Sequence, residues 1–204
     1  MQPKFIYFDL GKVLIDFNVE RMCRQMGEAA GIDPDRVKEA VYGGGLQMQY
    51  EAGRICGREF YEGFCRLTGS RPDPDALARA GSDIFTPNES IVPLVTQLAA
   101  SFKLGVLSNT CEGHWRHCFA RYAILRESFS VFALSYEIGV LKPDAAIFRR
   151  AAELAGCRPE EIFFTDDIAG HIAAARSVGF DAVVYTTPAE LAAELLRRGV
   201  GLNG

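Results

Sequence analysis

The first strongly apolar segment of the chain, residues 4–9, carries apolar side chains on both faces. Phe5 and Tyr7 point to one side of an extended chain. Ile6 and Phe8 point to the other side. A short run without a polar face is typical of a strand that is buried on both sides. Similar runs follow, and we expect strands at about 4–9, 103–108, 131–135, 162–166 and 182–185.

Helical patterns lie between these runs. We expect Asn88 to cap one helix, and Asp144 to cap another that ends at Gly156. Two more helices are expected at 169–177 and 188–198. Strands that alternate with helices predict an α/β fold with a Rossmann-like, doubly wound parallel sheet and right-handed crossovers.

One long stretch breaks the alternation. Residues 17 to about 87 show helical patterns and no convincing strand. We therefore expect a helical cap domain at 16–88, inserted into a core domain formed by 1–15 and 89–204. Within the cap, Gly43-Gly44-Gly45 is interpreted either as a hinge or as a helix-breaking turn.

Polar side chains follow the ends of the predicted core strands. Because the carboxyl ends of parallel strands meet at one edge of a sheet, we expect these side chains to converge on a single crevice. Singly, each one is more typical of a turn or a helix cap, but their order along the chain favours a site. They are Asp9, Ser108, Asn109, Lys142, Asp166 and Asp167.

The chemistry of this group suggests a metal-assisted phosphate site. Carboxylates that lie close together oppose one another's ionisation unless a cation lies among them. Oxygen ligands with no His or Cys nearby suit Mg²⁺, which often shares a substrate phosphate. Lys142 and Ser108 would then complement the anion, and Asp9 could attack phosphorus.

With these motifs the chain resembles the haloacid dehalogenase superfamily of hydrolases. The resemblance implies that Asp9 is the nucleophile. It also implies phosphate binding by Ser108, Asn109, Lys142 and Gly11. The motifs that carry it are Phe8-Asp9-Leu10-Gly11-Lys12-Val13, Leu107-Ser108-Asn109-Thr110, Leu141-Lys142-Pro143-Asp144 and Phe164-Thr165-Asp166-Asp167.

The same resemblance implies a set of metal ligands. Asp9, Asp167 and the backbone carbonyl of Gly11 would bind Mg²⁺ directly, and Asp166 would act mainly through water. The most similar branch acts on α-D-glucose 1-phosphate and related sugar phosphates. The phosphatase half of soluble epoxide hydrolase is also similar, in Asp166-Asp167-Ile168.

Gly11 departs from the pattern of most phosphatases in this superfamily, which carry a second Asp there to protonate the leaving group. Three alternatives remain open. The first, which we favour, is a Mg²⁺-dependent phosphatase whose leaving group needs little protonation, or whose acid comes from elsewhere. Asp16 is a candidate for that acid, although its position is more typical of a residue that caps the first helix of the cap. The second is a 2-haloacid dehalogenase, which the Asp166-Asp167 pair disfavours. The third is a non-catalytic protein that binds a phosphometabolite.

Three side chains near the expected entrance are further candidates. Glu51 and Arg54 flank a turn that small caps usually point at the crevice, and His114 follows Ser108 by six residues. Each has a structural alternative, as a solvated helix end or as a histidine satisfied within the core. Trp115 is expected to serve packing or an interface.

Composition narrows the partners. The 204 residues carry a net charge of −4 and no Lys/Arg cluster, so a nucleic-acid or membrane partner is unsupported. No apolar run approaches the roughly 20 residues of a membrane span, and no signal-peptide pattern opens the chain. We expect a cytoplasmic monomer or homodimer that acts on a small phosphorylated metabolite. The six cysteines form no C-x-x-C pair and are expected to be free, buried thiols.

Overall fold

The expected strands form one parallel sheet in the order β5-β4-β1-β6-β7, which confirms the predicted fold class. The computed structural model describes residues 2–202, so the outermost residues of the predicted core domain, 1 and 203–204, lie outside it. Phe8 at the end of β1 lies opposite Val106 in β4 and Thr165 in β6, so the three strands end at one level. The strands are β1 (Phe5–Phe8), β4 (Lys103–Ser108), β5 (Val131–Leu134), β6 (Ile162–Asp166) and β7 (Asp181–Val184).

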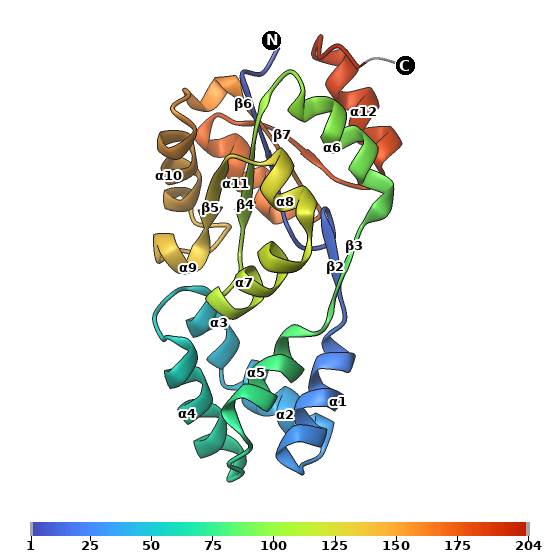
Figure 1. Cartoon of the computed structure of the whole chain (residues 1–204). Coiled ribbons are helices and arrows are strands. Elements are labelled where there is room, and N and C mark those ends of the chain that lie inside the picture. The colour runs from blue at the N-terminus through green and yellow to red at the C-terminus, as the bar shows by residue number, and fades with distance from the viewer. Residues whose placement is uncertain (1, 203–204) are drawn as a thin grey trace.

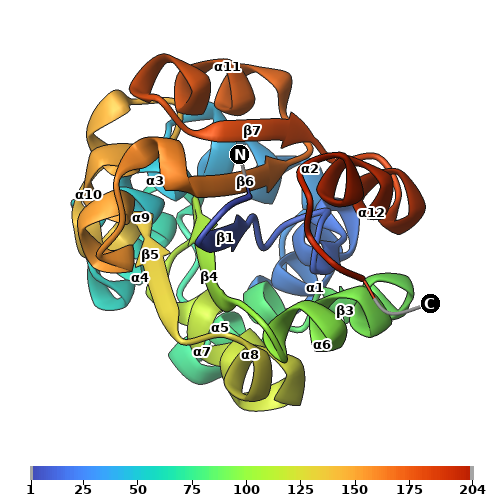
Figure 2. The ribbon, with the colours of Figure 1, turned by 90° about the horizontal axis from the view of Figure 1, so that it is seen from above.

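Helices cover both faces of this sheet (Figure 2), and each face has its own apolar core. Ile6 and Phe8 belong to the core shared with α6 (Val92–Ala99), α7 (Glu112–Arg121), α8 (Ala123–Ser128) and α12 (Pro188–Arg197). Phe5 and Tyr7 belong to the core shared with α10 (Ala145–Ala155) and α11 (Ala169–Val178). This division follows from the alternation of side chains along β1. Trp115 serves packing as expected, against Phe119 and Phe132.

One of the two capping predictions for the core is only half met, because Asn88 has the N-cap position without a side-chain capping bond. Asp144 caps α10 by accepting a hydrogen bond from Ala146 N at 2.8 Å. Asn88 instead precedes a short 3₁₀ turn, η2 (Glu89–Ile91), and makes no capping hydrogen bond. Its amide donates to Val13 O at 2.9 Å and to Tyr185 Oη at 3.0 Å. The side chain thus connects segments from distant parts of the chain instead of capping the helix.

The long helical stretch forms a separate group at the end of the molecule towards which the strands run (Figure 1). We call this group the cap. It has its own apolar cluster, which includes Met22, Met26, Phe64 and Leu77. Its elements are α1 (Val19–Ala30), α2 (Pro34–Lys38), a π-helical turn η1 (Glu39–Gly43), α3 (Leu46–Glu51), α4 (Gly57–Thr68) and α5 (Pro74–Ser82).

A two-stranded antiparallel ribbon joins the cap to the sheet, and sequence reasoning missed it. It pairs β2 (Ile15–Phe17) with β3 (Phe85–Pro87). The expectation of no strand between 17 and 87 is therefore wrong at its far end. Three-residue strands are too short to produce a readable alternation of polar and apolar positions.

The ribbon also corrects the interpretation of Asp16 as a helix cap. Asp16 lies within β2, and Asn18 caps α1 by accepting from Arg21 N at 2.8 Å. The Asp16 carboxylate is exposed and pairs with Lys12 Nζ at 3.3 Å.

The glycine run in the cap is a helix-breaking turn. It begins at Gly43, the last residue of the π-helical turn, and Gly45 has a φ of 69° just before α3. This left-handed backbone favours glycine.

The six cysteines are free, as expected. The expectation of burial is wrong for Cys56, which is exposed, and only half met by Cys157. Within residues 2–202, no helix is both long and apolar enough to cross a bilayer.

We predict that Gly105→Ala destabilises the fold. A methyl group there would lie 2.4 Å from Tyr7 Cε1, and the Tyr7 ring is pinned because its hydroxyl donates to Ala151 O. Overpacking of this kind lowers the free energy of unfolding by about 1–3 kcal/mol. Urea denaturation measures it. Gly170→Ala, at an unobstructed helical position, is the control and should leave stability unchanged or raise it by up to about 1 kcal/mol. Equal effects of both substitutions would contradict the prediction.

Candidate active site

Asp9 follows β1 directly and is held at the sheet edge by its neighbours. Its backbone N–H donates to Thr165 O at 2.9 Å, and its side chain is buried. Oδ1 accepts from Leu10 N at 2.7 Å and lies 2.9 Å from Lys142 Nζ. Among the described residues, none donates to Oδ2. Burial raises the pKa of Asp9, although the nearby ammonium of Lys142 opposes this effect.

Lys142 is buried, and all three contacts of its ammonium group are with oxygen atoms of the protein. Nζ lies 2.9 Å from Asp9 Oδ1 and 2.6 Å from Asp166 Oδ2, and it donates to Leu107 O at 2.9 Å. One positive charge therefore lies between two buried carboxylates. Its expected contact with a phosphate is indirect in this arrangement, because the three hydrogen-bond directions of the ammonium are already taken.

Asp166 ends β6 and is fully buried. Oδ1 accepts from Ile168 N at 2.8 Å, and His171 Nδ1 lies 3.0 Å from Oδ2. Burial opposes ionisation of Asp166, but the hydrogen bond from His171, together with the charge and hydrogen bond of Lys142, outweighs it and holds the pKa below its usual value.

His171, on α11, is a site residue that sequence reasoning missed. It lies only five positions after Asp166 and is buried against it. The available signal was its place in the first turn of the helix that follows motif Asp166-Asp167, where a side chain returns towards the strand end.

Asp167 completes a cluster of three carboxylates. One oxygen from each of Asp9, Asp166 and Asp167 lies within 4.8 Å of the others. Asp167 is partly exposed, and burial together with Asp166 raises its pKa. An all-oxygen donor set of this spacing fits a hard divalent cation such as Mg²⁺. Asp166 already accepts protein hydrogen bonds on both oxygens, so Asp167 is the freer ligand.

The segment after β4 faces the same edge. Ser108 is buried, and its hydroxyl has only a long contact, 3.4 Å to Asn109 O, among the described residues. Asn109 acts differently from its neighbour, because both ends of its amide hold the backbone of Lys142. Its Oδ1 accepts from Lys142 N at 2.7 Å, and its Nδ2 donates to Lys142 O at 2.9 Å.

A cavity of about 90 Å³ lies above this edge, between the sheet and the cap. The sequence candidates Glu51 and His114 line it, whereas Arg54 is exposed and lines neither this cavity nor the larger one described next. Asp16 is also absent from its wall. The core and ribbon contribute Leu10, Gly11, Ile15, Phe17, Ile84, Phe85, Ser108, Asn109, Thr110 and His114, and the cap contributes Tyr42, Gln47 and Glu51.

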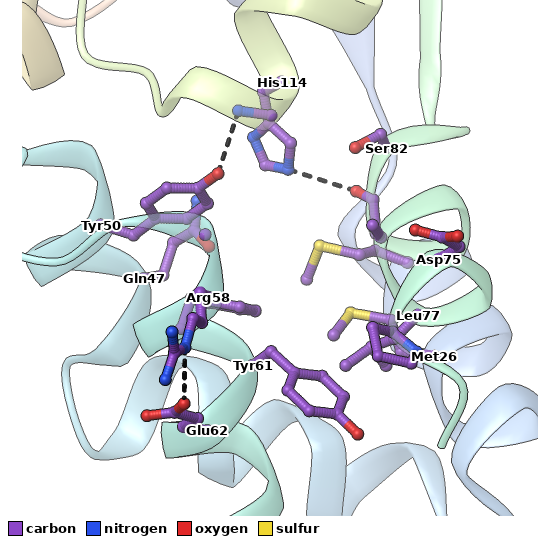
Figure 3. Close-up of a pocket in the computed structure, with 17 residues that line it drawn as sticks. Met26, Gln47, Tyr50, Arg58, Tyr61, Glu62, Asp75, Leu77, Ser82 and His114 are labelled. Atoms are coloured by element: carbon purple, nitrogen blue, oxygen red, sulfur yellow. Dashed lines mark hydrogen bonds and ion pairs between the residues drawn. The ribbon is translucent and has the colours of Figure 1, made fainter. Parts of the chain in front are cut away.

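A larger cavity of about 480 Å³ lies beside the first, mostly within the cap (Figure 3). Its wall is mainly apolar, with Met26, Leu77 and Tyr61 prominent. It shares only Gln47 and His114 with the smaller cavity. None of the three clustered carboxylates lines either cavity, but Ser108 and the two residues that follow Asp9, Leu10 and Gly11, line only the smaller one. The smaller cavity is therefore the one that adjoins the cluster.

Hydrogen bonds hold the cap against the core at this point. Tyr50 Oη accepts from Gly113 N at 3.1 Å, and His114 Nε2 donates to Gly81 O at 3.2 Å (Figure 3). Burial lowers the pKa of His114 to about 4, so its ring is neutral at pH 7. His114 is thus both a cavity residue and a hydrogen-bonded, partly buried histidine.

Comparisons with known proteins agree with this geometry. Residues 4–179 match the family described as haloacid dehalogenase-like hydrolase. The chain therefore belongs to the haloacid dehalogenase-like hydrolases, as its motifs predict, and it is a hydrolase.

Three related proteins illustrate the likeness. Glyceraldehyde 3-phosphate phosphatase of Methanopyrus kandleri is 31% identical over 68% of this chain, which spans only 62% of that relative. D-ribitol-5-phosphate phosphatase of Bacteroides thetaiotaomicron is 23% identical, over 87% of this chain and 89% of the relative. A solved structure of a family enzyme from Bacteroides thetaiotaomicron, in complex with magnesium and inorganic phosphate, has a TM-score of 0.81 and 26% identity. The match covers 91% of this chain and 95% of that one.

We predict that Lys142→Met destabilises the metal-free protein by about 3–5 kcal/mol at pH 7.5, because it leaves two buried carboxylates uncompensated. Without the ammonium, the folded-state pKa values of Asp9 and Asp166 rise, so the folded variant binds protons more readily. The stability gap to the wild type should therefore narrow as the pH falls. Urea denaturation in EDTA at several pH values measures it. The exposed Lys12→Met is the control, with an expected change within about 0.5 kcal/mol. A gap independent of pH would contradict the prediction.

We predict that His114 weakens the fold as the solution is acidified. The folded-state pKa of about 4 lies below the ordinary value of 6.5. The stability from the neutral ring is complete above pH 6.5 and is lost as the pH falls towards 4. His114→Gln should remove this part of the pH dependence in urea titrations. A ring resonance of His114 that titrates near pH 6.5 would contradict it.

Proposed function

We propose that the chain is a Mg²⁺-dependent phosphomonoester hydrolase that forms a phosphoryl intermediate on Asp9. The observation that carries the proposal is the Asp9 side chain, with Oδ1 fixed by Leu10 N–H and Lys142 and Oδ2 unengaged among the described residues. The carboxylate cluster and the phosphatase names of the two relatives support it. The magnesium and phosphate bound to the structural neighbour support the choice of cofactor and substrate class.

In this proposal Asp9, Asp167 and the Gly11 carbonyl hold the ion, and Asp166 acts through water. When bound, the ion would neutralise the carboxylates and stabilise charge on the phosphoryl oxygens. Ser108 donates its hydroxyl to a phosphoryl oxygen. Lys142 and His171 position Asp166 and Asp9 without touching the substrate.

The chemistry then runs in two steps. Asp9 Oδ2 attacks phosphorus, the bond between phosphorus and the ester oxygen breaks, and that oxygen takes up one proton and departs as the alcohol. Water next attacks phosphorus, the bond to Asp9 breaks, and phosphate leaves. Backbone donation from Leu10 and the ammonium of Lys142 hold Oδ1 aside during both steps.

We further propose a small substrate, such as a sugar phosphate. The cavity of about 90 Å³ supports this size class. In the proposed division, 16–88 is the cap domain over a core of 1–15 and 89–204. We place the protein in the cytoplasm as a monomer or homodimer, without a nucleic-acid or membrane partner, as its composition suggests.

A second candidate function is that of a 2-haloacid dehalogenase. Gly11 is compatible with it, because a halide leaves without a proton and needs no acid at this position. The Asp166-Asp167 pair opposes it, since attack on carbon needs no metal-binding carboxylates. Magnesium dependence separates the two. A non-catalytic phosphometabolite-binding protein would show neither activity.

We predict that the purified protein hydrolyses members of a panel of metabolite phosphates with Mg²⁺, and that EDTA abolishes this turnover. Asp9→Asn should lose on the order of 10⁴-fold or more of the rate, because the nucleophile is gone. Asp16→Asn, an exposed change outside the cavity, is the matched control and should keep the wild-type rate. Released phosphate is measured, beside halide release from 2-chloropropionate. Phosphatase activity that survives Asp9→Asn or EDTA would overturn the proposal.

A further inference from the structure

The proposed reaction lacks an obvious proton donor for the departing alcohol. Gly11 has no side chain, and Asp16 is exposed, paired with Lys12 and outside the cavity. Three side chains in the cavity wall could in principle exchange a proton, namely Tyr42, Glu51 and His114. The cap contributes Tyr42 and Glu51 to this wall, and α7 contributes His114.

Two of the three are poorly suited to the task. His114 is neutral at pH 7, with a pKa of about 4, and its Nε2–H is given to Gly81 O. Burial raises the pKa of Tyr42 to about 12, and its hydroxyl points to Met22 Sδ at 3.9 Å within the cap. A group with so high a pKa holds its proton tightly and is therefore a weak general acid at neutral pH.

We propose that Glu51 of the cap is the general acid and base of the reaction and supplies the function absent at Gly11. The inference rests on the proposed phosphatase activity. Glu51 ends α3 and lines the same small cavity as Gly11 and Ser108. The catalytic set would then be complete only when cap and core meet.

The backbone of Glu51 is anchored on the core beside the proposed phosphate site. Ser135 Oγ donates to Glu51 O at 2.6 Å and accepts from Thr110 N at 2.9 Å. A single hydroxyl thus connects Glu51 to the segment that carries Ser108. The next turn presses on the core as well, because a Cβ at Gly53 would lie 2.1 Å from Tyr136 O. Only glycine permits this approach, with its φ of 65°.

The carboxyl group of Glu51 is held through one oxygen, and its other oxygen is left without a donor among the described residues. Its Oε1 accepts from Gln47 Nε2 at 2.9 Å, and none of the described residues donates to Oε2. No cation pairs with it in residues 2–202. Burial raises the pKa of Glu51 above its ordinary value, which favours a proton on the group before reaction. The titratable groups that face it are Tyr42 from η1 and Cys111 and His114 at the start of α7.

The two steps balance with this assignment. As Asp9 Oδ2 bonds to phosphorus, the bond to the ester oxygen breaks, and the proton of Glu51 passes to that oxygen, which leaves as a neutral alcohol. Glu51 is then a carboxylate. It accepts a proton from the water that attacks the phosphoryl group on Asp9, and phosphate departs with Glu51 protonated again.

The test varies how much the leaving group needs a proton. We would measure kcat/KM with Mg²⁺ for an alkyl phosphate accepted by the wild type and for a series of substituted phenyl phosphates up to p-nitrophenyl phosphate. For Glu51→Gln, the alkyl ester should lose about 10²-fold or more, whereas p-nitrophenyl phosphate should lose less than about 5-fold. A plot of log kcat/KM against leaving-group pKa should therefore be steeper for the variant. Glu51→Asp should restore part of the alkyl ester rate.

Controls separate this inference from the function on which it rests. Glu28→Gln makes the same chemical change at an exposed position on α1 and should follow the wild-type line. An equal loss for all esters in Glu51→Gln, or no loss, overturns the role of Glu51 while leaving the phosphatase proposal intact. Absence of wild-type turnover of every ester overturns both.

Discussion

The ammonium of Lys142 lies between the carboxylates of Asp9 and Asp166, and hydrogen bonds from neighbouring strands and loops hold it there. Two buried negative charges at one sheet edge would otherwise repel each other and favour protonation. Lys142 cannot leave this place easily, because Leu107 O takes its third hydrogen bond and Asn109 holds its backbone at both ends. The two ion pairs and the hydrogen bond to Leu107 O oppose the desolvation cost of burying these charged groups. Asp9, the proposed nucleophile, is thus oriented by contacts within the protein itself.

The sheet supplies this arrangement through its register. Phe8 lies level with Val106 and Thr165, so the residues that follow β1, β4 and β6 emerge side by side. Alternating side chains of β1 anchor the two apolar cores, which leaves the strand little freedom to slide. His171 then closes the network from α11, with its Nδ1 at 3.1 Å from Asp166 Oδ1 and 3.0 Å from Oδ2. Packing on both sides of the sheet therefore sets the position of a few polar atoms.

The sequence predicts the elements that carry a readable hydrophobic periodicity, but it does not reveal very short strands or particular tertiary contacts. The apolar runs predicted all five core strands to within two residues at either end, and the motifs predicted the Asp9, Lys142 and Asp166 cluster. The β2–β3 ribbon escaped because three-residue strands carry no readable period. Asn88 and His171 escaped for a different reason. Their partners, Tyr185 and Asp166, are defined only after folding.

The cap shows why a site that spans two units resists prediction from sequence. Glu51 and Gln47 are one helical turn apart and would be assigned to a solvated helix end by their polarity alone. The surroundings of Glu51 are set instead by two contacts with the core. Ser135 donates a hydrogen bond to Glu51 O, and Gly53 packs closely on Tyr136. These contacts enclose a carboxyl group that water would otherwise solvate, and enclosure is what alters its proton affinity. The chemical character of Glu51 is therefore a property of cap and core together, and it follows from the closure of the cap rather than from the helix that carries it.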